Sequence, residues 1–371
     1  MGVGRRAVEE MGVNPGFWRG RRVLVTGHTG FKGSWLSLWL HAMGADVAGF
    51  ALAPPTEPSL FELARVAELV SSEQGDVRDG AAVEGAVRAH RPDVLIHMAA
   101  QSLVRRSYAD PVETYDTNVM GTVNVLEAVR RTADARVVIN VTTDKVYENL
   151  ERDEPFGEDE PKGGHDPYSN SKACAELVTA AYRSSFFGPG SSSSPSPAVI
   201  ASARAGNVIG GGDWGADRLV PDLVRGALGG HTVRIRNPDA IRPWQHVLNP
   251  LSGYLQLAEA MWDSPAFGQA WNFGPDERDE RTVRHVADQL AAHWDGGIEW
   301  EPDPGDHPHE AHYLRLDSAK ARTQLGWAAR WDLDRALAGI AAWHRRLGAG
   351  EDARAITLAE VHAFAREEST V

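Results

Sequence analysis

Seven residues near the N-terminus, at positions 27–33, constrain the fold of this chain more than any other feature. They read Gly-His-Thr-Gly-Phe-Lys-Gly, follow the apolar run 23–25, and lead into a segment, residues 31–43, with the pattern of an amphipathic helix. Glycines let a backbone turn sharply and approach a pyrophosphate, and a helix N-terminus presents free N–H groups to an anion. A strand, a glycine-rich turn and a helix in this order predict a dinucleotide-binding unit.

Strands and helices alternate over the first half of the chain. The predicted strands are 23–26, 46–52, 71–76, 93–99, 136–142 and 199–203, and the predicted helices are 31–43, 81–90, 112–132 and 169–187. Such alternation gives a parallel, doubly wound sheet with right-handed crossovers. The predicted fold class is therefore α/β, a Rossmann-type sheet with a smaller C-terminal lobe that binds the substrate.

The elements become shorter and less regular beyond residue 206. We therefore predict a mobile or loosely docked extension at 1–20 and a mainly dinucleotide-binding domain at 21–206. Residues 207–350 are predicted to form mainly the substrate lobe, with segments near 240–297 returning to the sheet, and 351–371 a C-terminal helix or tail. Residues 270–275, Ala-Trp-Asn-Phe-Gly-Pro, have the pattern of a strand that enters a loop.

Composition excludes several classes of partner. The 371 residues carry a net charge of -13, whereas binding to a nucleic-acid backbone needs a basic face. Cys174 is the only cysteine, so no intrachain disulfide can form, and a reducing cytoplasm fits. The apolar stretch 35–53 is interrupted by polar residues and is better explained as helix, turn and strand than as a membrane span. We expect a cytoplasmic protein with neither a nucleic-acid nor a membrane partner.

A tyrosine and a lysine four residues apart predict hydride chemistry. Tyr168 directly precedes the predicted helix 169–187, which contains Lys172, and a spacing of four residues places both side chains on one helix face. An ammonium near a phenol stabilises the phenolate and lowers its pKa, which makes tyrosine a workable base for an alcohol whose carbon loses a hydride. Thr143, just after the strand 136–142, supplies a hydroxyl that would bind the same substrate oxygen.

The glycine turn and the Tyr-x-x-x-Lys pair together resemble those of extended short-chain dehydrogenases/reductases. Residues 143–149, Thr-Asp-Lys-Val-Tyr-Glu-Asn, resemble the sugar-nucleotide 4,6-dehydratases of that superfamily, in their CDP-glucose branch. This resemblance covers about residues 18–345, and further landmarks are 27–36, 54–61, 100–108, 204–214, 241–247 and 308–313. It implies NAD as the cofactor and a homodimer formed through a four-helix bundle, with 112–132 and 169–187 as the candidate helices.

The resemblance implies a reaction in three steps, from CDP-D-glucose to CDP-4-keto-6-deoxy-D-glucose and water. In the oxidation at C4, Tyr168 would take the proton of the 4-hydroxyl, assisted by Thr143 and Lys172. In the elimination across C5 and C6, Asp144 would protonate the leaving 6-hydroxyl, and Lys145 stands where related enzymes place a glutamate base. The hydride then returns to C6. A lysine acts as a base only if burial or nearby cations lower its pKa.

Binding residues are also assigned by the resemblance. Asp76 and Val77 would hold the adenine, residues 99–101 would pass under the cofactor, and the planar fork of Arg242 would grip a phosphate. The expected cofactor residues are Gly27, His28, Thr29, Gly30, Phe31, Lys32, Gly33, Asp76, Val77, Ala99, Ala100, Gln101, Tyr168 and Lys172. The expected substrate residues are Gln101, Ser102, Arg105, Asn207, Arg218, Arg236, Arg242, Asn272 and His309.

Some features depart from the family pattern, and several polar residues are expected to have no catalytic or metal-binding role. The NAD fingerprint places an acid about 20 residues after the glycine turn, but residues 49–55 read Gly-Phe-Ala-Leu-Ala-Pro-Pro, so neither the NAD nor the NADP sign is present. His28 and Lys32 add cationic side chains that would contact or crowd the phosphates. Asn118 is expected to be structural and His246 packed. The spacing of His307, His309 and His312 matches no common metal site, so no metal is expected.

Two alternative functions stay open. One is a 4,6-dehydratase or 4-epimerase that acts on another nucleotide sugar, because the pocket for the base cannot be identified from the sequence. The other, of a different class, is a catalytically inactive protein that senses NAD(P). The presence of Thr143, Asp144, Tyr168 and Lys172 together argues against it.

Overall fold

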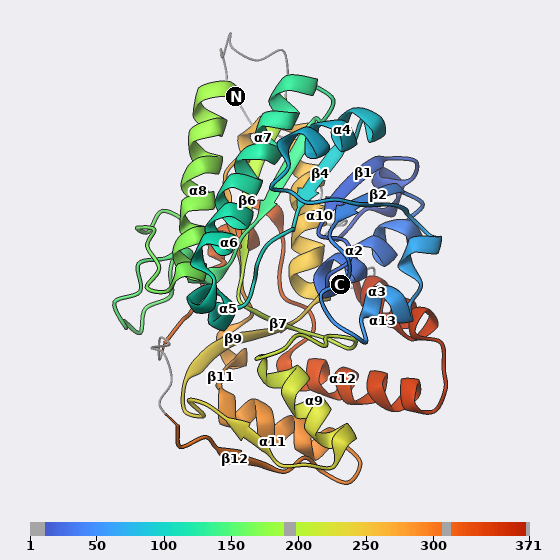
Figure 1. Ribbon diagram of the computed structural model, residues 1–371, viewed down its shortest axis with the longest axis vertical. Coiled ribbons are helices and arrows are strands. Elements are labelled where there is room, and N and C mark those ends of the chain that lie inside the picture. The colour runs from blue at the N-terminus through green and yellow to red at the C-terminus, as the bar shows by residue number, and fades with distance from the viewer. Residues whose placement is uncertain (1–11, 189–197, 306–312, 369–371) are drawn as a thin grey trace.

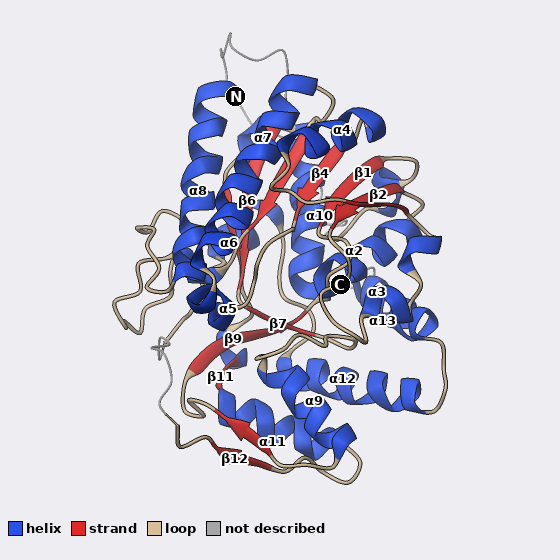
Figure 2. Ribbon diagram, in the orientation of Figure 1, coloured by secondary structure: helices blue, strands red, loops and turns tan. Residues whose placement is uncertain are grey.

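A seven-stranded parallel sheet, in the order β10-β6-β5-β4-β1-β2-β3, is the centre of the computed structural model, which describes residues 12–188, 198–305 and 313–368 (Figures 1 and 2). Every pair of neighbouring strands in it runs parallel. The chain reverses its direction of winding between β1 and β4, which is where ligands bind in such sheets. The strands are β1 (Arg22–Thr26), β2 (Asp46–Ala51), β3 (Ser71–Gln74), β4 (Val94–His97), β5 (Val137–Val141), β6 (Val199–Ala205) and β10 (Ala270–Phe273).

Helices cover both faces of the sheet, because the inner strands send apolar side chains to both sides. Val23 and Val25 belong to the core shared with α2 and α10, whereas Leu24 belongs to the core shared with α4 and α7. The flanking helices are α2 (Phe31–Ala42), α4 (Gly80–His90), α7 (Gly121–Thr132), α8 (Pro167–Phe186) and α10 (Leu248–Asp263). The predicted Rossmann-type, doubly wound sheet is confirmed.

The predicted single helix at 112–132 is divided into α6 (Pro111–Tyr115), the π-helical turn η2 (Asp116–Met120) and α7. The wider turn carries Asn118, whose Oδ1 accepts the Gln101 N–H at 2.9 Å. Its Nδ2 donates to the Gln101 carbonyl at 3.0 Å and to the Ser171 hydroxyl at 2.9 Å. Asn118 therefore ties the loop after β4 to helix α8, and its predicted structural role is confirmed.

The predicted loose docking of the N-terminal extension is wrong for the described part of it. Residues 15–18 form the short helix α1 (Pro15–Trp18). Trp18 is fully buried and its Nε1 donates to Glu259 of α10 at 2.7 Å, while Phe17 packs edge-on against Trp262. Aromatic burial of this size holds the segment on the core. Residues 1–11 lie outside the described ranges.

The smaller lobe lies beyond the carboxyl ends of the sheet strands and contains two short sheets, ordered β11-β9-β7 and β12-β8 (Figure 1). The last helix, α13, returns to the sheet domain, where Phe364 packs against Trp39 of α2. Across the described ranges, no helix is long and apolar enough to cross a membrane. The remaining elements are α3 (Leu60–Leu63), η1 (Val66–Glu68), α5 (Val104–Ala109), η3 (Asp144–Val146), β7 (Asn207–Ile209), α9 (Leu219–Gly229), β8 (Val233–Ile235), β9 (Ile241–His246), η4 (Pro265–Phe267), η5 (Glu277–Asp279), β11 (Glu280–Thr282), α11 (Val283–His293), β12 (Trp300–Pro302), η6 (Ala321–Leu325), α12 (Leu333–Gly348) and α13 (Ala353–Glu368).

Candidate active site

A cavity of about 720 Å³ lies between the carboxyl edge of the sheet and the smaller lobe. The sheet domain lines it with the glycine turn, the end of β2, residues 75–77 and 98–106, and the catalytic candidates after β5 and on α8. The lobe lines it with residues 205–209, 212–222 and 233–237, together with Arg242 and Trp244. Both halves of the predicted site therefore face one continuous space.

The glycine turn forms a cradle that side chains would fill. A Cβ atom at Gly27, which has φ of +78°, would lie 2.7 Å from the backbone nitrogen of Ala99. A Cβ atom at Gly33 would lie 2.2 Å from the Gly27 carbonyl oxygen. Residues 30–33 line the cavity, and no side chain caps the start of α2 there. This geometry suits the close approach of a diphosphate to a helix N-terminus.

His28 does not supply a cation to this cradle, so that prediction is wrong. Its side chain is fully buried under the turn, and Nε2 shares a 2.7 Å hydrogen bond with Ser72. The ring occupies space that only a glycine leaves open, because a Cβ atom at Gly49 would lie 2.2 Å from it. Burial lowers the pKa of His28 to about 4, so the imidazole is neutral and serves the packing between β1 and β2.

Lys32 lines the cavity, but at its catalytic end. Its Nζ donates to the hydroxyl of Tyr254 on α10 at 3.1 Å. Burial, with the neighbouring Lys172 and Arg218 cations, lowers the pKa of Lys32 to about 7, while Asp144 acts in the opposite direction. The charge of Lys32 therefore lies near the catalytic groups, a placement that its position in a phosphate-binding motif did not indicate.

The loop after β4 is held by its own hydrogen bonds. Thr26 Oγ1 accepts the N–H groups of Met98 and Ala99 at 3.1 and 3.2 Å, so its own proton is directed to Nδ1 of His97 at 2.7 Å. Gln101 Nε2 donates to the Leu103 carbonyl and to Thr114, and its Oε1 accepts the Leu103 N–H. Gln101 itself lines the cavity, so its predicted role in binding stays a prediction. This side chain braces the loop that carries Ala99 and Ala100 along the cavity.

Asp76 and Val77 line the end of the cavity next to β2. Arg78 holds the pKa of the Asp76 carboxyl below its usual value through hydrogen bonds of 2.5 to 2.9 Å. The end of β2 adds Ala51, Leu52 and Ala53, and Thr29 Oγ1 is held by the Leu52 carbonyl at 2.9 Å. Residues 51–53 carry no charged side chain that would select NAD over NADP or the reverse.

Thr143, Asp144 and Tyr168 meet in one hydrogen-bonded group. Thr143 caps the turn η3, donating to Asp144 Oδ1 at 2.9 Å and accepting from the N–H of Lys145 at 3.4 Å. The Tyr168 hydroxyl forms a hydrogen bond with the Thr143 side chain. Burial raises the pKa of Tyr168 to about 12, although this hydrogen bond and the Arg218 cation act in the opposite direction.

Lys172 lines the cavity one turn of α8 beyond Tyr168. Its Nζ donates to the Val141 carbonyl at 3.2 Å, and burial lowers its pKa to about 8 while Glu176 acts in the opposite direction. Burial of the phenol therefore outweighs the groups that lower the Tyr168 pKa, which are Thr143 and Arg218, and the lowering by Lys172 stays a prediction.

Asp144 has the surroundings of a general acid. Its Oδ2 is buried and has no hydrogen-bond partner among the described residues. Burial raises the pKa of its carboxyl, opposed by Lys145, Thr143 and Arg242, and so favours the protonated form. Gly206 keeps this space open, because a Cβ atom there would lie 3.2 Å from Asp144 Oδ2. Lys145 is half-buried and lines the cavity next to Asp144.

Arginines dominate the opposite wall of the cavity. Arg218 lies at the start of α9 and donates to Ser102 at 2.9 Å and to Asp213 at 3.4 Å. Arg105 and Arg236 both contact Asp217, through its carboxylate at 3.3 Å and its carbonyl at 3.4 Å respectively. Among the predicted substrate residues, Ser102 and Arg105 line the cavity from the sheet domain, and Asn207, Arg218, Arg236 and Arg242 line it from the smaller lobe. Such a wall suits the diphosphate of a nucleotide sugar.

Asn272 does not reach the cavity, so its predicted role in substrate binding is wrong. It is fully buried, its Oδ1 accepts the Tyr147 hydroxyl at 2.7 Å, and its Nδ2 donates to the carbonyls of Phe156 and Asp317. Every polar group of its side chain is thereby used within the protein. His246 is packed against Trp35, as predicted. His309 lies outside the described residues.

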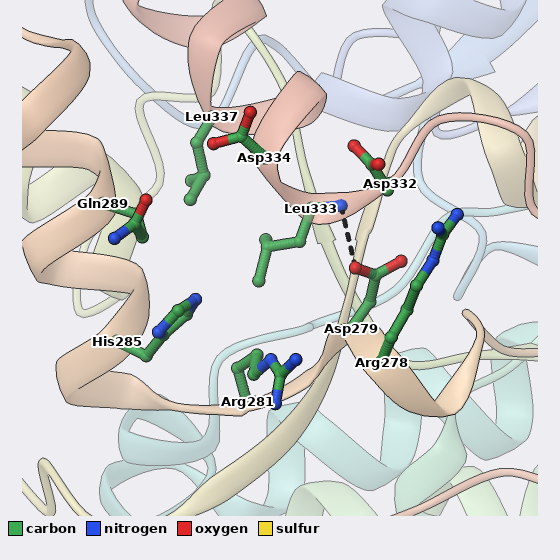
Figure 3. A pocket seen from close by; sticks show the side chains of 9 residues that line it. All are labelled: Arg278, Asp279, Arg281, His285, Gln289, Asp332, Leu333, Asp334 and Leu337. Atoms are coloured by element: carbon green, nitrogen blue, oxygen red, sulfur yellow. Dashed lines mark hydrogen bonds between the residues drawn. The ribbon is translucent and has the colours of Figure 1, made fainter.

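A second cavity, of about 170 Å³, lies between η5, β11 and the start of α12 (Figure 3). Its carboxylates serve the fold: Asp279 accepts the Leu333 N–H at 3.1 Å, and Asp332 caps α12 by accepting the Arg335 N–H at 3.0 Å. No group of three His, Cys, Asp or Glu side chains in the described part of the chain is arranged to hold a metal ion.

Comparisons with known proteins agree with this geometry. The sequence model of the family described as GDP-mannose 4,6 dehydratase matches residues 24–339. CDP-glucose 4,6-dehydratase of Salmonella typhimurium is 52% identical over 341 residues, which cover 92% of this chain and 95% of that protein. Among solved structures, dTDP-glucose 4,6-dehydratase of Streptomyces venezuelae with NAD bound has a TM-score of 0.72 at 25% identity, covering 90% of this chain and 99% of that one. UDP-glucose 4-epimerase of Stenotrophomonas maltophila has a TM-score of 0.76 at 21% identity, covering 89% of this chain and 100% of that one.

Proposed function

The chain belongs to the GDP-mannose 4,6-dehydratase family, and within it we propose that the protein converts CDP-D-glucose into CDP-4-keto-6-deoxy-D-glucose and water. The observation that carries this proposal is the hydrogen-bonded group of Thr143, Asp144 and Tyr168 inside a cavity whose other wall carries arginines. The choice of CDP-glucose rests on the 52% identical relative, which is a CDP-glucose 4,6-dehydratase.

NAD is the cofactor in this proposal, and the chain offers it a fitting site. The cradle at Gly27 and Gly33 would hold the diphosphate, and residues 75–77 the adenosine end. The loop at Ala99 would lie under the middle of the dinucleotide. Bound NAD would supply the acceptor, and later the donor, of the hydride, and its positively charged ring would favour the phenolate of Tyr168.

The chain's own residues supply the proton transfers. Tyr168 takes the proton of the 4-hydroxyl, which Thr143 orients by its own hydroxyl. Once C4 is a ketone, the hydrogen on C5 is acidic, and Lys145 removes it. Asp144, whose protonated form is favoured by burial, donates its proton to the departing 6-hydroxyl, which leaves as water. The arginine wall binds the diphosphate, so that the sugar reaches these four residues in a fixed orientation.

Isotope transfer tests this cycle. Deuterium placed at C4 of CDP-glucose is expected at C6 of the product, because the hydride that leaves C4 returns within the same site. Mass spectrometry and NMR of the product measure its position, and no stoichiometric build-up of NADH is expected. Loss of the label to solvent would contradict the dehydratase cycle. Parallel assays with UDP-, GDP- and dTDP-glucose identify the base, and a faster reaction with one of them would overturn the choice of CDP.

A homodimer in the cytoplasm belongs to the same proposal. The single cysteine suits a reducing compartment. Helices α6 and α7 both pack against α8 (Figure 1), and apolar side chains of α6 and α8 are exposed, with Val112 77% and Leu177 58% exposed. Tyr108, Tyr115 and Met120 extend this apolar surface. Exposed apolar area of this kind marks a protein interface, and two copies pairing here would form a four-helix bundle.

Leu177→Arg is expected to convert the dimer to a monomer, because the charge would have to be buried between the two copies of α8. Light scattering at increasing dilution measures the mass. Leu228→Arg is the matched control, since Leu228 is also 58% exposed but lies on α9 in the smaller lobe. A dimer that survives Leu177→Arg, or that is lost equally in the control, would place the interface elsewhere.

A further inference from the structure

A buried ion pair lies directly behind the catalytic group. Arg204 of β6 and Glu176 of α8 are only 2% and 4% exposed. Arg204 Nε donates to Glu176 Oε1 at 2.9 Å, and Nη2 donates to Oε2 at 2.8 Å. Removing two charges from water is costly, and apolar residues of similar volume often stabilise a core as well. A buried pair next to the candidate active site is therefore a candidate for a role besides stability.

The pair holds both ends of the segment that carries the catalytic turn. At its start, Thr142 Oγ1 donates to Glu176 Oε1 at 2.5 Å. At its end, the Tyr147 hydroxyl accepts from Arg204 Nη1 at 2.7 Å. Residues 143–145, which include all the acid and base candidates except Tyr168, lie between these two anchors. The segment is thus attached to one rigid, charged unit at two points.

The same unit belongs to the helix that carries the other catalytic residues. Glu176 follows Lys172 by one helical turn and Tyr168 by two, so the three side chains share one face of α8. The bond between Glu176 and Thr142 joins the start of the catalytic segment directly to this face. It consequently sets the position of the turn relative to Lys172 and Tyr168.

We propose that Glu176, clamped by Arg204, is a positioning residue that holds segment 142–147 in register with α8, so that Thr143 and Asp144 meet Tyr168. This inference rests on the proposed function and adds to it residues that contact neither sugar nor cofactor. Glu176 also acts on charge: it counteracts the effect of burial on the Lys172 ammonium, which otherwise faces Lys32 of α2 and His97 of β4.

Thr142→Val tests the positional part. Valine keeps the shape and removes only the donor, and Glu176 keeps its bonds to Arg204 and to Ser202. We expect kcat per folded site to fall about tenfold or more, because small displacements of reacting groups cost rates of this order, with KM for CDP-glucose unchanged. Thr142→Ser, which restores a hydroxyl, is expected to recover most of the rate.

Thr179→Val is the matched control. Thr179 is a buried threonine of the same helix that accepts from Asn140 of β5 at 2.8 Å, farther along the interface and away from the cavity. It removes a comparable bond, so it is expected to lower thermal stability and to leave kcat per folded site unchanged. Equal losses of kcat in both variants would mean that the bond at Thr142 only stabilises the fold, and would overturn the inference.

Glu176→Gln tests the effect of charge through the pH profile. Without the carboxylate, the Lys172 ammonium loses its proton at lower pH, so the alkaline limb of kcat/KM is expected to shift to lower pH. Thr142→Val leaves that limb in place. A profile for Glu176→Gln that matches wild type would overturn this part.

Circular dichroism and titration of active sites give the folded fraction. A wild-type protein inactive on every nucleotide sugar would refute the proposed function itself, whereas active wild type with unaffected Thr142→Val refutes only the positioning role.

Discussion

Tyr168→Phe is expected to abolish the first step of the reaction, with turnover lowered by about 10² to 10⁴-fold, the usual contribution of one acid–base group. Phenylalanine keeps the ring, which is 9% exposed, and removes only the oxygen that faces Thr143. Asp144 is the other described side chain that forms a hydrogen bond with Thr143, and burial raises the pKa of its carboxyl and so favours its protonated form. Rapid mixing with CDP-glucose is therefore expected to show no nicotinamide reduction.

Tyr182→Phe is the matched control for this variant. Tyr182 lies on the same helix, and its hydroxyl donates to Glu127 at 3.4 Å on the surface outside the cavity. Calorimetry should give the same affinity for CDP-glucose in both variants, because the arginine wall is untouched. Nicotinamide reduction by Tyr168→Phe at the wild-type rate would show that another group accepts the 4-hydroxyl proton.

The sheet and most of its helices were predictable because their signals are local. Most strands contain short apolar runs, although β3 is polar and exposed, and the glycine turn occurs where β1 meets α2. The spacing of Tyr168 and Lys172 also predicts a shared helix face without knowledge of the fold. By contrast, the division of the predicted helix at 112–132 depends on Asn118 reaching Gln101, a contact that only the folded chain creates.

The errors at the site have a common physical cause. A motif identifies a backbone path but does not give the direction of each side chain along it. His28 turns under the glycine loop into space left by Gly49, and Asn272 is saturated by Tyr147 and two carbonyls. The pairing of Glu176 with Arg204 was not predicted, because no local sequence signal marks it. They are 28 residues apart, Arg204 belongs only to a landmark of the family resemblance, and the two become a unit only when α8 packs against β6.

Lys145→Met is expected to separate oxidation from elimination. Tyr168, Thr143 and Lys172 stay in place, so C4 is still oxidised, but removal of the C5 hydrogen is expected to be about 100-fold slower. The acid step is not impaired, because the Lys145 cation opposes the raised pKa of Asp144, and its loss leaves that carboxyl more fully protonated. Rapid mixing should show nicotinamide reduction at the wild-type rate, followed by slow appearance of the 4-keto-6-deoxy product.

Lys145→Arg distinguishes a base from a charge. Arginine keeps the cation next to Asp144, yet its pKa, above about 12, prevents it from accepting a proton at neutral pH. If Lys145 is the base, Lys145→Arg is therefore as slow in product formation as Lys145→Met, while both reduce nicotinamide normally. Recovery of the rate with arginine alone would mean that the position needs only positive charge. Wild-type turnover by Lys145→Met would mean that another group, or water, is the base. Lys145, although it lies next to Asp144, would then not take part in removal of the C5 hydrogen.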